Sequence, residues 1–146
     1  HWTRSDDGGP TLTVDGEKWS GTTTRADIEA RTKPLWAVTS EAFLAYATAS
    51  DAFPIAIASD VSGFSSGTVR VEFKLMGGRS DQNAGIVFGL VPTDLDYYFV
   101  RYNTKDGDVA LWRFSHGKRA VIAHGEPAGS RLPLKGWDKL TLRVGS

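Results

Sequence analysis

Two strong hydrogen-bonding side chains, Arg101 and Asn103, end an otherwise apolar run with the sequence DYYFVRYN, residues 96–103. If this run is an extended strand, alternation puts both side chains on the same face as Tyr97 and Phe99. Planar amides and guanidinium groups can bridge the vicinal hydroxyls of a sugar, and aromatic rings can stack on its apolar face. The residues that offer this chemistry are Gln82, Arg101, Asn103, Trp112 and Arg113. The pattern predicts a saccharide site at a sheet face or rim.

A structural role for Arg101 is the alternative. A buried guanidinium needs a partner, and either Asp81 or Glu72 could hold Arg101 as a lock between neighbouring strands. Trp112 is the preferred stacking platform, because it alternates with Leu111, which is the better core residue. The sequence leaves both roles of Arg101 open.

Acid–base catalysis has two candidates, Glu72 and His124. A retaining glycosidase needs two carboxylates about 5 Å apart, and no strand in the sequence carries such a pair. The same-face neighbours of Glu72 are Arg70 and Lys74, whose charges favour an ionised surface carboxylate over an acid with a raised pKa. His124 ends a strand alone, which is more typical of a surface histidine than of a catalytic one.

Paired aspartates at turns are the candidates for a metal site. Asp94 with Asp96, and Asp106 with Asp108, offer carboxylate oxygens from loops, which are the ligands that calcium accepts. Aspartate is commoner as a turn former than as a metal ligand. Calcium is therefore the one cofactor that these loops suggest, and no other is expected.

Composition limits the partners. The 146 residues hold 17 basic and 17 acidic side chains, with no net charge and no cysteine. Neutrality argues against nucleic acid and anionic membranes as partners, and the lack of cysteine rules out a disulfide framework. No apolar run has the length of a membrane span or signal peptide, and the chain begins at His1, which suggests processing or trimming.

Periodicity predicts a β protein of one domain, residues 1–146. Alternating or apolar runs at 69–75, 86–90, 97–103, 109–114, 119–124 and 139–144 predict six strands, and shorter strands are expected at 35–38, 43–47 and 53–58. The Asp-Gly pair at 106–107 predicts a tight hairpin. Residues 1–33 are expected to be irregular, with a small hairpin turning at Asp15-Gly16. The run TTTRADIEARTK (22–33) is expected to be a loop with at most a helical turn or two, because Ile28 and alanines make too small an apolar face.

The order of these pieces carries a resemblance. The segments FPIAIA, GTVRVEFKLMGGRSDQNAGIVF, DYYFVRYN, LWRFSHGKR and WDKLTLRV resemble the LamG-like jelly-roll domains of the concanavalin A-like superfamily. They are closest to the bacterial group that includes 3-keto-disaccharide hydrolase domains and many exported proteins, over residues 34–144. The resemblance implies a jelly-roll sandwich of two antiparallel sheets, an extracellular or periplasmic bacterial protein, and a ligand on the concave sheet. Asp81, Gln82 and Gly85, with residues 97–103, match recurrent motifs of the family.

Two departures from that pattern bear on the interpretation. Residues 8–33 have no counterpart in the family, and the strands that usually follow the W-x-x-L-x-x-x-V segment are absent after Val144. An incomplete sandwich exposes an edge that pairs readily with another strand. The sequence is therefore expected to be a fragment, or to be completed by another segment or chain.

The function expected from these observations is that of a carbohydrate-binding, lectin-like module. One alternative, implied by the resemblance, is a glycoside hydrolase or lyase acting on a (keto-)disaccharide through Glu72, Arg101 and His124. The other is a structural or assembly module that uses its open sheet edge.

Overall fold

The computed structural model describes residues 2–15, 24–36, 41, 44–45, 55–56, 58, 60–61, 63–78, 81–91, 96–115, 118–126 and 131–145. They fall into two units, His1–Ser62 and Gly63–Ser146, and each unit is described by itself. Most of the described residues lie in antiparallel β-sheets, as the sequence predicts, in a sandwich-like, β-rich architecture. Within the described residues, no helix has the length and apolarity required to cross a membrane.

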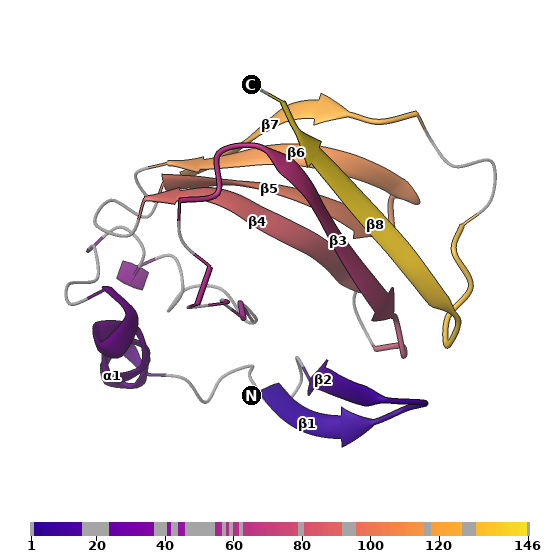
Figure 1. The fold of residues 1–146 in the computed structure, drawn as a ribbon, viewed down its shortest axis with the longest axis horizontal. Coiled ribbons are helices and arrows are strands. Elements are labelled where there is room, and N and C mark those ends of the chain that lie inside the picture. Colours follow the sequence, from indigo (N-terminus) through magenta and orange to yellow (C-terminus); the bar gives the residue numbers. More distant parts are fainter. Residues whose placement is uncertain are drawn as a thin grey trace. The chain divides into compact units, whose positions relative to one another are not determined.

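The second unit holds a two-stranded ladder and a four-stranded sheet (Figure 1). The ladder pairs β3 (Gly67–Lys74) with β8 (Trp137–Val144). The sheet has the order β4-β5-β6-β7, formed by β4 (Asn83–Val91), β5 (Asp96–Asn103), β6 (Asp108–Ser115) and β7 (Lys118–His124). All six strands are predicted by the sequence patterns, with ends that differ by a few residues.

The turn between β5 and β6 also follows the prediction. Gly107 adopts a φ of 72°, a left-handed conformation that glycine accepts without steric cost, and its N–H donates to the Asn103 carbonyl at 2.8 Å. The turn pairs Asn103 with Asp108 across the hairpin. It fixes the register of the two central strands, on which the site depends.

The ladder covers one face of the four-stranded sheet. β4 contacts both β3 and β8, and the ladder crosses the sheet in Figure 1. The backbone N–H of Leu132, just before β8, donates to the Tyr102 hydroxyl at 3.0 Å, so the face that holds Tyr102 is turned toward the ladder. By alternation, Arg101 lies on the opposite face of the sheet.

The first unit contains a hairpin that the sequence did not predict, and the predicted turn at Asp15-Gly16 includes Gly16, which lies outside the described residues. β1 (Trp2–Asp6) pairs with β2 (Pro10–Val14), so the chain turns at residues 7–9. The physical reason is an aspartate turn: the Asp6 carboxylate accepts from the N–H of Gly9 at 3.1 Å. Gly8, with a φ of 75°, supplies the left-handed residue.

A second correction concerns residues 25–36, which form the helix α1 (Arg25–Trp36) instead of a loop. Thr24 caps it: its hydroxyl accepts from the Asp27 N–H at 3.2 Å, and the Asp27 carboxylate accepts from the Thr24 N–H at 3.0 Å. This reciprocal pair is a capping box. Among the helical residues whose side chains are described, only Ile28 is buried, so the expected weakness of the apolar face is real and the cap compensates for it.

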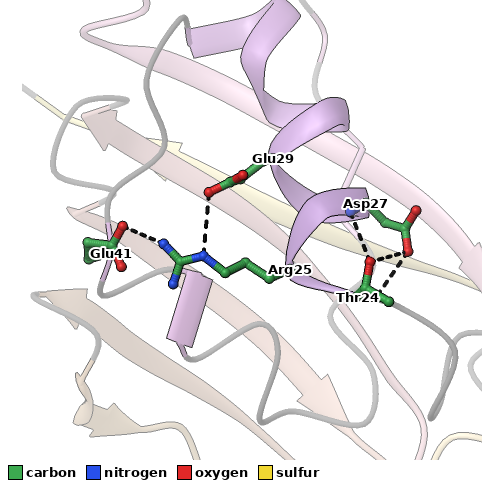
Figure 2. A network of polar contacts seen from close by, with 5 residues as sticks. All are labelled: Thr24, Arg25, Asp27, Glu29 and Glu41. Atoms are coloured by element: carbon green, nitrogen blue, oxygen red, sulfur yellow. Dashed lines mark hydrogen bonds and ion pairs between the residues drawn. The ribbon is translucent and has the colours of Figure 1, made fainter.

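Ion pairs extend this network (Figure 2). The Nε of Arg25 lies 3.5 Å from the Oε1 of Glu29, one turn along the helix, and its Nη2 lies 2.5 Å from the Oε1 of Glu41. The hydrogen bond and charge of Glu41 raise the pKa of Arg25.

The short strands predicted at 35–38 and 43–47 are wrong where the structure describes them, because residues 35–36 and 44–45 are helical. Residues 55, 56 and 58 are not in a strand, and the remainder of these segments lies outside the described residues.

Candidate functional site

Most side chains of chemical interest lie on the face of the four-stranded sheet that is opposite Tyr102, here called the Trp112 face; Asn103, Tyr97 and Phe114 on this face are buried. Its side chains form four rows across the strands: Asn83, Asn103 and Asp108; Gly85, Arg101, Ala110 and His124; Val87, Phe99, Trp112 and Val121; and Tyr97, Phe114 and Arg119. The first two rows are polar with two small residues, and the last two are mainly aromatic. The face therefore changes from hydrogen-bonding groups to ring surfaces along the strands.

Trp112 is flanked by two guanidinium groups. The Arg101 group lies 5.3 Å and the Arg119 group 5.1 Å from the indole ring centroid, within the range of a cation–π contact. Phe99 stacks beside Trp112 with ring centroids 6.1 Å apart and an interplanar angle of 12°. Sequence reasoning missed Arg119. The signal was available, because pairing of β7 with β6 in antiparallel order brings the start of β7 beside the end of β6.

Arg101 is held by an amide instead of a carboxylate. Its Nη1 donates to Asn83 Oδ1, whereas Asp81 accepts from Asn103 and Glu72 pairs with Lys139. Burial lowers the pKa of Arg101, the charge of Arg119 lowers it further, and nearby carboxylates act in the opposite direction. The Arg101 Nε and the Trp112 Nε1 are both buried, with no hydrogen-bond partner in the described part of the chain. Two buried donors without acceptors are unusual in a folded protein.

Asn103 and Gln82 serve the β5–β6 turn. Asn103 is only 2% exposed; its Nδ2 donates to Asp81 at 2.8 Å and its Oδ1 accepts from the Lys105 N–H at 2.7 Å. The Gln82 N–H donates to the Thr104 hydroxyl at 2.9 Å. The polar atoms of Asn103 are thus used within the fold.

Arg113 is not brought to the Trp112 face. It alternates with Trp112 and lies on the Tyr102 side, where its guanidinium group is 5.8 Å from the Tyr98 ring centroid and 3.8 Å from Asp96. Of the five predicted ligand-binding residues, the structure therefore places Arg101, Asn103 and Trp112 on one face. Gln82 lies just before the first residue of β4.

The two catalytic candidates are in different sheets. Glu72 is on the exposed side of β3, with its Oε1 at 3.1 Å from Lys139 Nζ. His124 lies on the Trp112 face, and its Nδ1 is 2.7 Å from Asp108 Oδ2. Asp108 is mostly buried while His124 is mostly exposed, so the carboxylate orients the imidazole. The sequence missed this pair because it read Asp108 as a turn residue.

The aspartates predicted as metal ligands are not grouped with further ligands in the described part of the chain. Asp96 accepts from Ser115 at 2.9 Å, and Asp94 lies outside the described residues. Among the residues that the structure describes, no three His, Cys, Asp or Glu side chains are grouped as metal ligands.

No protein-family model, no curated protein and no solved structure matches this chain. The resemblance to LamG-like domains stays a prediction. A function is therefore proposed below from the arrangement of side chains on the Trp112 face.

Proposed function

We propose that the chain is a carbohydrate-binding, lectin-like module that holds a saccharide on the Trp112 face. The observation that carries the proposal is the arrangement of Trp112 between the guanidinium groups of Arg101 and Arg119. A sugar ring stacks on an aromatic face while its hydroxyls accept from guanidinium groups.

The expected jelly-roll topology and an extracellular or periplasmic location in a bacterium belong to this proposal. The topology is supported by the resemblance and by the antiparallel β-rich architecture, and the location by the resemblance alone. Calcium at the loop of Asp94 and Asp96 is the one cofactor the proposal would accommodate.

The test is a glycan array, with and without calcium, followed by titration calorimetry on the best ligand. Trp112→Ala should weaken binding at least tenfold, since loss of one stacking ring removes a major contact. Arg119→Gln should weaken it less, and because Arg119 is exposed on the edge strand β7, this variant is expected to fold. Trp137→Ala, in the ladder, is the matched control. No binding by a folded chain, or equal loss in the control, would reject the proposal.

A second candidate is glycoside hydrolysis or elimination, favoured by the His124–Asp108 pair. A histidine oriented by a buried carboxylate is a typical general base, and it lies in the same row as Arg101. Mass spectrometry of the eluted sugars separates the two functions. Intact sugar supports binding alone, whereas cleaved sugar that is lost with His124→Gln but not with Glu72→Gln supports catalysis on the Trp112 face.

The assembly alternative has one supporting observation. β7 is an edge strand in the described part of the sheet, and all its residues are exposed. Edge strands pair readily with further strands. Concentration-dependent oligomers without any sugar response would favour this role.

A further inference from the structure

The two guanidinium groups beside Trp112 have no carboxylate partner. Arg119 is exposed at the start of β7 and forms no ion pair in the described part of the chain. Arg101 donates to Asn83, whose amide orients the guanidinium but does not neutralise it. Charges that lose water in a fold are normally paired. The two positive charges around Trp112 are therefore held in place without being neutralised.

The two guanidinium groups also repel each other. Burial lowers the pKa of Arg101, and the positive charge of Arg119 lowers it further. The fold thus keeps two like charges beside one indole ring, although this arrangement disfavours the charged form of Arg101. An anion bound next to both groups would offset the repulsion through charge-assisted hydrogen bonds, which are stronger than neutral ones.

The carboxylates that act on the charge of Arg101 all lie at the turn end of the Trp112 face. They are Asp81, two residues before β4, Asp106, in the β5–β6 turn, and Asp108, at the start of β6. Each acts on Arg101 more weakly than Arg119 does, and Asp108 is already paired with His124 at 2.7 Å. The rows that contain Trp112 and Arg119 have no acidic side chain among their paired residues. Within the described sheet, the positive charge at this end of the face is not balanced.

This end of the face is open to solvent along the edge strand β7. Trp112 is half-buried, and Val121, its neighbour on β7, is 44% exposed. Arg119 lies two residues before Val121 on the same strand and is exposed as well. A sugar ring can therefore reach the indole and the Arg119 guanidinium together from the β7 side.

We propose that the saccharide held on the Trp112 face carries a carboxylate or sulfate group, as a uronic acid or a sulfated sugar does. The inference rests on the proposed function and adds the class of ligand to it. A guanidinium binds anionic oxygens through two parallel hydrogen bonds, and carboxylate and sulfate share the oxygen geometry that it recognises. The sugar ring stacks on Trp112, while Arg101 and Arg119 bind its anionic group. A neutral sugar would leave both positive charges uncompensated.

The experiment compares acidic saccharides with their neutral counterparts on the full chain. The array carries oligosaccharides of polygalacturonate beside their carboxyl-reduced forms, and oligosaccharides of carrageenan beside their desulfated forms, among neutral glycans. In calorimetric titration, we expect the acidic member of a pair to bind at least about tenfold more tightly than the neutral one. The preference should fall as sodium chloride is raised from about 0.05 to about 0.5 M, because salt screens charge. Preference in the first pair identifies a carboxylate, and preference in the second identifies a sulfate.

Substitution of Arg119 tests the charge separately from the ring. Arg119→Gln should lower the affinity for the acidic saccharide about fivefold and change that for the neutral counterpart by less than about twofold. Arg119→Lys keeps the charge without the planar fork and should give an intermediate loss. Trp112→Ala should weaken binding of both members of the pair. A merely structural role of Arg119 would instead change the two affinities by the same factor.

Matched controls come from the opposite face of the sheet. Arg113→Gln removes a half-exposed guanidinium from that face, and Lys118→Gln removes an exposed cation that neighbours Arg119 in β7. Both variants should keep the acidic preference within about twofold of the unmodified chain, since neither side chain lies on the Trp112 face. Circular dichroism checks that each variant is folded.

The outcomes separate this inference from the proposed function. Equal affinity for the acidic and neutral members of each pair, or binding of neutral glycans alone, overturns the inference and leaves the lectin-like module standing. Polyphosphate that binds as tightly as the acidic saccharide, and is unaffected by Trp112→Ala, also overturns it, because the sugar ring would then have no part. Absence of binding to any glycan by the folded chain rejects both.

Discussion

Side chains alternate between two faces in both the β3–β8 ladder and the four-stranded sheet, but the faces differ in what they hold. In the ladder, Val69, Val71 and Phe73 are half-buried while Arg70 and Glu72 are exposed, so one side packs and the other meets water. The four-stranded sheet carries large side chains on both faces. One face turns toward the ladder, and the other holds stacked rings and guanidinium groups. In the ladder, packing explains which side chains are half-buried and which are exposed. On the Trp112 face, packing does not explain why two guanidinium groups lie beside the aromatic rings.

The largest effect is expected at the aromatic end of the Trp112 face. Phe114 is 1% exposed and stacks on Tyr97 with ring centroids 4.9 Å apart and an interplanar angle of 11°. Phe114→Ala should lower the free energy of unfolding by about 3–5 kcal/mol, because it leaves a cavity in a packed region. Urea denaturation measures this loss. Val121→Ala, half-exposed on β7, is the control and should change stability by less than about 0.5 kcal/mol; similar losses for both would show that this end is not packed as described.

An intermediate effect is expected at the polar end. Asn103→Ala removes the donor to Asp81 and the acceptor for the Lys105 N–H, and it should cost about 1–3 kcal/mol because two part-buried hydrogen bonds are lost. Asn83→Ala, at an exposed position of the same row, should cost less. If both variants lose equal stability in urea denaturation, burial does not distinguish the two amides.

The strands of the second unit were predictable because each combines an alternating or apolar pattern with a turn signal. The Asp106-Gly107 pair gave the right hairpin, since the turn needs a residue with positive φ. The two-sheet arrangement is non-local, so no sequence window contains it. The pairing of His124 with Asp108 depends on register between β6 and β7, which the single sequence leaves open.

The N-terminal unit was predicted less well, for local reasons. The helix α1 was missed because the absence of an apolar stripe outweighed the Thr24–Asp27 capping box, although the cap and the ion pairs of Arg25 hold the helix. The β1–β2 hairpin was not predicted, although the DDGG sequence at 6–9 is a turn signal. Capping and turn chemistry therefore carried more information than hydrophobic periodicity in this unit.

A small effect is expected on the exposed side of the ladder. Glu72→Gln removes the ion pair with Lys139, and both side chains are more than half exposed, so the loss should be at most about 1 kcal/mol. Denaturation in low and high salt checks it, because salt screens an exposed pair. A double-mutant cycle with Lys139→Gln isolates the pair. A loss above about 2 kcal/mol, or one insensitive to salt, would contradict the surface role assigned to Glu72.

The smallest change in stability is expected at Arg101, where the two roles left open by the sequence make opposite predictions. Burial and the charge of Arg119 lower the pKa of Arg101, which means that the fold disfavours its charged form relative to the unfolded chain. Arg101→Met keeps much of the side-chain stem and removes the charge. We expect the free energy of unfolding to stay within about 0.5 kcal/mol or to rise slightly, while saccharide binding is lost.

A polar lock between strands would behave differently. If Arg101 held the sheet together through a buried ion pair, Arg101→Met would leave a buried carboxylate uncompensated and cost about 3–5 kcal/mol. The hydrogen bond from Arg101 goes to Asn83, an amide, so removal of the guanidinium takes no hydrogen bond from a carboxylate. Urea denaturation and calorimetric titration of the same variant therefore separate the two roles: unchanged stability with lost binding supports a ligand-binding arginine, and lost stability with retained binding of the folded fraction supports the lock.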